Sequence, residues 1–150
     1  MGSLRVQEVR TNGVFSIDGD DFEVENNIWL IGDDHEVVVI DAAHDAAPIA
    51  DAVGDRNVRG IFLTHGHNDH INAASELQRM VRNARGIVPI MLHPHDLMLW
   101  SAIYPTAQPD VALSHGLEIA FAGVTARVLH TPGHSPGGVC LLLHHDVDRV

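Results

Sequence analysis

The fold of this chain is indicated by the stretch Thr64-His65-Gly66-His67-Asn68-Asp69-His70, which places three imidazoles and one carboxylate within seven residues. The apolar run at 60–63 in front of it predicts a buried strand, and a helix is expected to follow. The end of a strand in an open α/β sheet is where such folds place their ligands. Imidazole and carboxylate are zinc ligands. The stretch therefore predicts a metal site.

A chance cluster in a satisfied polar loop is the alternative, because the chain contains twelve histidines. The order H-x-H-x-D-H argues against it. His65 and His67 can converge from an extended turn, whereas Asp69 and His70 point from the first turn of the next helix. The motif is a hypothesis that its structural context must support. In this order of ligands the sequence resembles the metallo-β-lactamase-fold superfamily.

Strands and helices are expected to alternate along the chain, which indicates the α/β class. The expected strands are 4–10, 27–31, 36–40, 58–64, 88–92, 117–121, 124–129 and 139–143, and the expected helices are a short one capped by Asp45 and a longer one over 69–83. Asn12-Gly13, Asp18-Gly19 and Ala122-Gly123 are predicted turns. The resemblance implies the αββα sandwich of the superfamily, with residues 1–150 forming one domain and the second half of the fold missing or truncated after residue 150.

Composition limits the range of functions. Hydrophobic residues make up 45% of the 150 residues, enough for a core, and the formal net charge is −11. So acidic a chain is not expected to bind nucleic acid or an anionic membrane. Residues 1–10 contain no apolar segment, so a cytoplasmic location is the default expectation. The single cysteine, Cys140, rules out an intrachain disulfide and is expected to be a buried strand thiol.

The second informative stretch is His130-Thr131-Pro132-Gly133-His134-Ser135-Pro136-Gly137-Gly138, in which prolines and glycines fix the path of a loop. Thr-Pro-Gly-His after the upstream motif resembles the hydroxyacylglutathione hydrolase group, also called glyoxalase II. The resemblance implies that His134 joins His65 and His67 around one metal, while Asp69 and His70 face a second. It also implies that His130 does not bind the metal and either supports a ligand or has a structural role.

The sequence departs from this group near its end. The aspartate that bridges the two metals and the last histidine ligand have no counterpart here. Asp146 and Asp148 are expected in or beside a hairpin turn, which is the wrong place for a bridging ligand, and His144 and His145 are expected to be exposed turn residues. An isolated first half would expose an apolar sheet face, which favours a partner or a homo-oligomer.

The resemblance implies a metal-dependent hydrolase acting on a thioester of a small thiol. Two zinc ions would lower the pKa of a shared water toward ~7 and supply hydroxide, with Asp69 as metal ligand and hydrogen-bond acceptor. Hydrolysis of β-lactams or lactones belongs to the same class. One alternative is a persulfide dioxygenase with a single iron, since non-haem iron favours two histidines and one carboxylate. A truncated, non-enzymatic metal-binding chain is the other.

Other polar residues carry weaker predictions. Asp41 either orients a ligand histidine or caps a turn, and the sequence favours neither. His35 and His44 are expected in exposed loops. The stretch 93–96 (His-Pro-His-Asp) is interpreted as a helix start outside the metal shell. Residues 100–110 are predicted to form a loop whose aromatic residues line one wall of a pocket.

Overall fold

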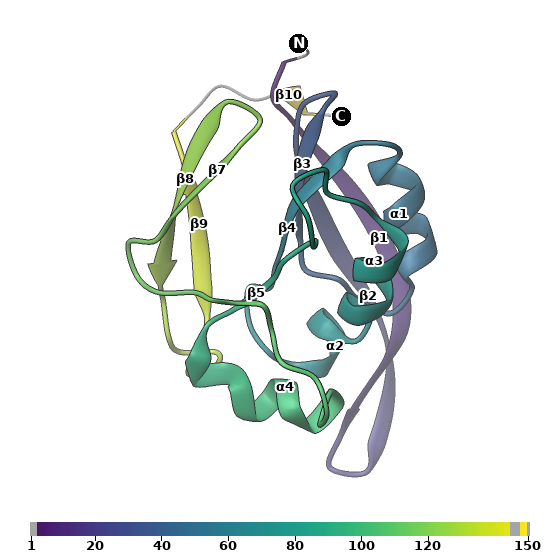
Figure 1. Cartoon of the computed structure of the whole chain (residues 1–150). Helices are drawn as coiled ribbons and strands as arrows, with labels where there is room; N and C mark the ends of the chain where they lie inside the picture. The colour runs from purple at the N-terminus through teal and green to yellow at the C-terminus, as the bar shows by residue number, and fades with distance from the viewer. Residues whose placement is uncertain (1–2, 145–147, 150) are drawn as a thin grey trace.

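The computed structural model describes residues 3–144 and 148–149 and contains two β-sheets with helices packed mainly on one side (Figure 1). The strands are β1 (Arg5–Ile17), β2 (Asp20–Gly32), β3 (Glu36–Ile40), β4 (Asn57–Phe62), β5 (Ile90–Leu92), β6 (Val111–Ala112), β7 (Glu118–Phe121), β8 (Val124–His130), β9 (Val139–Leu143) and β10 (Asp148–Arg149). The helices are α1 (Ala46–Val53), α2 (Asn68–Ile71), α3 (Ala74–Met80) and α4 (Leu97–Ile103), with a 3₁₀ turn over Pro94–Asp96 before α4.

The larger sheet has seven strands in the order β10-β1-β2-β3-β4-β5-β6, and the smaller sheet has the order β7-β8-β9. Strands β3 to β6 run parallel to one another. Because parallel strands present their carboxyl ends at one edge, the segments after β3, β4 and β5 meet there. The α/β class predicted from the alternation of strands and helices is confirmed, and so is the double-sheet arrangement that the resemblance implied.

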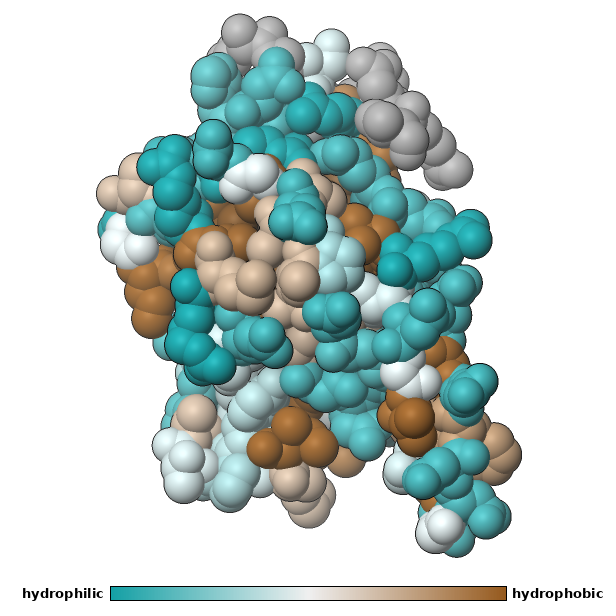
Figure 2. Space-filling model, turned by 90° about the vertical axis from the view of Figure 1, so that its right-hand side faces the viewer, coloured by the Kyte–Doolittle hydropathy of each residue, from teal (hydrophilic) through white to brown (hydrophobic). Residues whose placement is uncertain are grey.

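The core has two layers, one on each face of the larger sheet. On one face, residues such as Val39 and Ile61 pack against Ile49 of α1 and Leu77 of α3. On the other face, residues that include Val38, Phe62 and Met91 pack against the inner side of the smaller sheet. Figure 1 shows α1, α2 and α3 on the first face and the β7-β8-β9 sheet on the second. Figure 2 shows the helical side, where hydrophilic side chains are interspersed with hydrophobic ones.

The prediction of a turn at Asn12-Gly13 is wrong. These residues lie inside β1 and pair with Glu25 and Val24 of β2. The turn of this long hairpin is Asp18-Gly19, where both residues have positive φ, as a two-residue hairpin turn requires. Gly13 has a different role, because a Cβ there would lie 2.1 Å from Nδ1 of His44. The glycine makes room for that ring.

The helix expected over 69–83 is interrupted between α2 and α3. Ala73 donates its backbone N–H to the carbonyl of Ala42, and Ala42 donates to the carbonyl of His70, each at 3.0 Å. Ala42, in the loop after β3, thus forms hydrogen bonds with backbone groups that a continuous helix would have paired with one another. As a result, His70 is held against the loop that carries Asp41.

The structure corrects three further predictions. Trp100 lies in α4, fully buried, and Tyr104 donates a 2.6 Å hydrogen bond to the carbonyl of Ile71, so these aromatics belong to the core and not to a pocket wall. Cys140 is exposed on β9. Asp148 lies in β10, which pairs in parallel with β1 in the larger sheet and does not form a hairpin with β9.

Other predictions are confirmed or lie outside the described residues. Asp45 caps α1 by accepting from the Ala47 N–H at 3.1 Å, as predicted. His144 is exposed, as expected, whereas His145 and Asp146 lie outside the described residues. Among the described residues, the structure contains no helix long and apolar enough to cross a membrane.

Candidate metal centre

Three of the predicted ligands converge between the two motif loops. His65 and His67 follow β4, and His134 lies in the loop between β8 and β9. Each offers one ring nitrogen, and these three nitrogens lie within 4.8 Å of one another. Nδ1 of His67 and Nε2 of His134 are only 3.1 Å apart. His65 is buried, His67 is half-buried and His134 is exposed, so the cluster is reachable from solvent on one side.

The ring of His65 is fixed with one nitrogen free. Asp41 accepts from both the backbone N–H and the hydroxyl of Thr64, at 2.8 and 3.0 Å. Because the hydroxyl donates to Asp41, it accepts from Nδ1 of His65 at 2.9 Å. The lone pair therefore lies on Nε2, which is buried and has no hydrogen-bond partner among the described residues. A buried polar atom without a partner is costly, and a metal ion would satisfy it.

Asp41 also orients His70. Nδ1 of His70 lies 2.8 Å from Oδ2 of Asp41, so the ring donates there and directs Nε2 away from Asp41. That Nε2 lies 3.7 Å from Oδ2 of Asp69, and the rings of His65 and His70 are 4.2 Å apart between centroids. Of the two roles considered for Asp41, the structure shows the first, orienting histidines, together with a hydrogen bond to a backbone N–H. Its own φ is +67°, a position that tertiary contacts must hold.

Asn26 of β2 is a site residue that the sequence analysis did not identify. Its amide nitrogen is 3.3 Å from both Asp69 Oδ2 and His70 Nε2. Its amide oxygen lies 2.8 Å from Nε2 of His44, which is half-buried and not an exposed loop residue as expected. Asparagine is uncommon inside strands, but its burial here is known only from the structure, so the sequence offered no clear signal.

The electrostatic environment shifts the pKa values of the histidines in different directions. Burial, with the neighbouring His70 ring, lowers the pKa of His65 from 6.5 to about 4. Burial and the nearby His134 also lower the pKa of His67. Burial lowers the pKa of His70 as well, but the hydrogen bond and charge of Asp41 outweigh it and the net shift is upward. At neutral pH the rings of His65 and His67 are thus uncharged, as metal ligands must be.

Asp96 joins the two motif loops, although the stretch that contains it was interpreted as a helix start outside the metal shell. Its side chain is fully buried. Oδ2 accepts from the Gly66 N–H at 2.9 Å and from the Ser135 hydroxyl at 2.8 Å, and Oδ1 accepts from the Gly137 N–H at 2.7 Å. Gly66 lies between His65 and His67, and Ser135 follows His134. One carboxylate therefore sets the spacing of the loops that carry the three histidines.

The comparisons with known proteins agree with this geometry. The sequence profile of the metallo-beta-lactamase superfamily matches residues 22–147. The chain belongs to the metallo-β-lactamase superfamily. An uncharacterised protein of Aquifex aeolicus is 38% identical over 117 residues, covering 71% of this chain and 53% of that protein. A hydroxyacylglutathione hydrolase of Aeromonas salmonicida is 32% identical over 120 residues, covering 77% of this chain and 41% of that protein.

A solved structure of the superfamily has the same fold. BJP-1, a subclass B3 metallo-beta-lactamase of Bradyrhizobium japonicum, superposes with a TM-score of 0.66 at 19% identity, covering 80% of this chain and 51% of that one. The chain thus spans about half the length of the relatives it matches. The predicted resemblance to this superfamily of metallo-hydrolases is confirmed. The histidine cluster of this chain is suited to a metal cofactor.

Proposed function

We propose that the chain carries the metal centre of a hydrolase that cleaves the thioester of a small thiol. The observation that carries the proposal is the convergence of one ring nitrogen each from His65, His67 and His134, together with a buried Nε2 of His65 that has no hydrogen-bond partner among the described residues. The hydroxyacylglutathione hydrolase relative, which acts on a thioester by its name, supports the substrate class.

The residues present fit a metal at two adjoining positions. His65, His67 and His134 would hold one zinc ion, and Asp69 and His70 would face a second. Bound zinc lowers the pKa of water toward ~7 and polarises a carbonyl. Asp41 contributes by fixing the tautomers of His65 and His70, so that each presents the lone pair of Nε2 toward the centre.

In this proposal Asp69 accepts the proton of the attacking water. Its Oδ2 has one long hydrogen bond, 3.3 Å from Asn26, which leaves capacity to accept another. A thiolate leaves without prior protonation, so the reaction requires no separate general acid. This favours a thioester over substrates whose leaving group must be protonated.

The test is metal content and turnover of the 150-residue chain, purified without chelator and with air excluded. We expect at least two zinc ions per chain, two of them at this centre, and release of thiol from a 2-hydroxyacyl thioester of glutathione without oxygen. Asp69→Asn should lower turnover by about 10²–10⁴-fold, whereas the control Asp51→Asn, at an exposed position of α1, should not.

Two results would overturn the proposal. About one iron per chain with oxygen consumption on a persulfide would assign a dioxygenase in place of a hydrolase. Absence of turnover with thioester, lactone and persulfide would assign a non-enzymatic metal-binding chain. Urea unfolding of Asp69→Asn is measured beside its turnover. A variant that is folded but inactive has lost the reaction, whereas a variant that is unfolded does not test it.

A further inference from the structure

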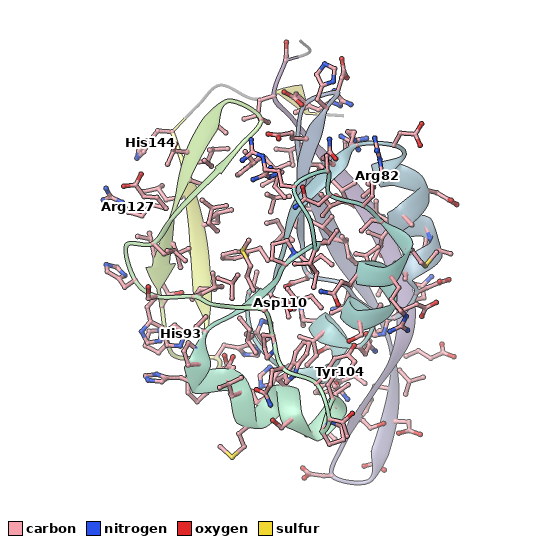
Figure 3. The ribbon with its side chains drawn as sticks, viewed as in Figure 1. Arg82, His93, Tyr104, Asp110, Arg127 and His144 are labelled. Carbon is pink, nitrogen blue, oxygen red and sulfur yellow. The ribbon has the colours of Figure 1, made fainter. Side chains whose placement is uncertain are left out.

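A second group of three histidines lies outside the centre described above. His93 follows β5, His95 lies in the 3₁₀ turn, and His130 ends β8. Each offers one ring nitrogen, and the three nitrogens lie within 4.8 Å of one another. Figure 3 shows His93 where β5 leads into α4, at the end of the smaller sheet. The group shares no residue with the first cluster.

We propose that His93, His95 and His130 form a second, peripheral binding site for a divalent transition metal, zinc in the first instance. The rings already lie against one another. His93 and His130 are stacked with centroids 4.0 Å apart and planes 13° apart, and the ring of His95 lies 4.6 Å from His93 and 5.4 Å from His130.

The tautomer of His130 is the one that a metal ligand needs. Its Nε2 lies 3.0 Å from the carbonyl oxygen of Pro136. A carbonyl only accepts, so Nε2 carries the proton and Nδ1 keeps its lone pair. A ligand histidine commonly donates its second nitrogen to a backbone carbonyl in this way.

His93 must give up a hydrogen bond in order to bind a metal. Its Nδ1 accepts from the backbone N–H of His95 at 3.1 Å. Coordination through Nδ1 would replace this bond, and coordination through Nε2 would move the proton to Nδ1 and end it as well. One neutral hydrogen bond is thus exchanged for a coordinate bond, so we expect micromolar affinity. Burial and the two neighbouring rings lower the pKa of His93, which keeps it uncharged at neutral pH.

Binding one ion requires the three nitrogens to move closer together and the stacked rings of His93 and His130 to turn. Tetrahedral zinc with bonds of about 2.0–2.1 Å places its nitrogens roughly 3.4 Å apart. Because no pair of nitrogens is more than 4.8 Å apart, each pair must close by about 1.4 Å or less, and His95 is the exposed member of the group. Three imidazoles without a carboxylate favour zinc, nickel or copper over magnesium or calcium. The neighbouring carboxylate of Asp96 is already occupied by its three hydrogen bonds.

Such a site would connect the segment that contains Asp96 to the loop that carries His134. His95 precedes Asp96, and His130 begins the loop that carries His134. Three protein ligands leave a fourth position open to water or to an external donor, as in zinc sites that are not purely structural. Bound zinc there would hold this loop in place from its outer side.

The experiment is zinc binding measured by calorimetry on a variant that lacks the first cluster. In His67→Ala/His134→Ala, which leaves the first cluster with His65 alone and the adjoining position with only Asp69 and His70, we expect one zinc ion to bind with a micromolar Kd, at the second site. Adding His95→Ala should weaken binding at least tenfold, whereas adding the control His35→Ala, at another exposed histidine, should leave it unchanged.

Either of two outcomes would overturn the proposal: no zinc bound to the double variant, or binding that persists unchanged after His95→Ala. Should the double variant not fold, the same comparison is made on the chain with an intact first cluster, where His95→Ala should remove one equivalent of zinc. No activity is needed for either measurement, so failure of the proposed hydrolase and failure of this site are distinguishable.

Discussion

Replacing Asp96 by asparagine tests whether one buried carboxylate holds the metal centre together. The carboxylate accepts three hydrogen bonds, at 2.9, 2.8 and 2.7 Å, from Gly66, Ser135 and Gly137. An amide has only one oxygen. In its better orientation the oxygen keeps the bonds from Gly66 and Ser135, and the NH₂ group faces the Gly137 N–H, donor against donor.

The magnitude follows from these contacts. Hydrogen bonds to a charged group contribute about 1.5–3 kcal/mol each, and an unsatisfied buried donor costs about 1–3 kcal/mol. With one bond lost and two weakened, we expect Asp96→Asn to lower the free energy of unfolding by about 2–4 kcal/mol. Because the loops it connects carry His65, His67 and His134, zinc affinity should fall by about 10–100-fold, as for other groups that support metal ligands.

Two measurements separate positioning from stability alone. Urea unfolding gives the stability loss, and competition with a chromophoric chelator, below the unfolding transition, gives the zinc affinity. Leu77→Ala is the matched control, because it removes a fully buried side chain of α3 at a cost of about 2–5 kcal/mol without touching either loop. If Asp96→Asn binds zinc as tightly as the unaltered chain, or no more weakly than Leu77→Ala, the reasoning is refuted.

Three further predictions use the same assays. Gly137→Ala should lower the free energy of unfolding by about 1–3 kcal/mol, because a Cβ there would lie 2.7 Å from Cγ of Asp96. Gly133→Ala is the control, since a Cβ at that position would have nothing within 4 Å and should change urea unfolding little. An equal loss of stability in the two variants would contradict this reasoning. Asp41→Asn should lower zinc affinity about 10–100-fold, because the two histidine rings that Asp41 orients lose their fixed tautomers; an unchanged chelator competition would argue against that role. The free energy of unfolding of the metal-free chain should fall by up to about 3 kcal/mol as the pH falls from 6.5 to about 4. The reason is that His65 takes up a proton in the unfolded chain at a higher pH than in the folded one. A His65→Gln variant whose stability has the same pH dependence would show that another group is responsible.

The local pattern of the sequence was sufficient for much of the fold. Alternating strand and helix patterns predicted the α/β class, and the cap at Asp45 and the turn at Asp18-Gly19 needed only local chemistry. The spacing H-x-H-x-D-H and the later Thr-Pro-Gly-His identified the side chains that converge. These features depend on residues close together in the chain, so they can be recognised without knowing the packing.

Where the sequence analysis was wrong, contacts between distant segments overrode a local preference. Asn12-Gly13 stays in a strand because β2 pairs with it residue by residue. The predicted helix breaks at Ala73 because the loop after β3 takes its backbone hydrogen bonds. Trp100 is in the core because α4 extends to Ile103, into the predicted loop, and this side chain packs against the residues of the helical face.

The residues that support the centre were decided only by the tertiary structure. In the first motif the candidate ligand nearest in sequence to Asn26 is His65, 39 residues away, and the one nearest to Asp96 is His70, 26 residues away. No local pattern links them. The same holds for His130, which meets His93 only because the two sheets bring the end of β8 beside the end of β5. The sequence by itself determined which side chains could bind a metal. Packing of the sheets decided which groups orient them, because hydrogen bonds to buried polar atoms form only where the fold brings donor and acceptor together.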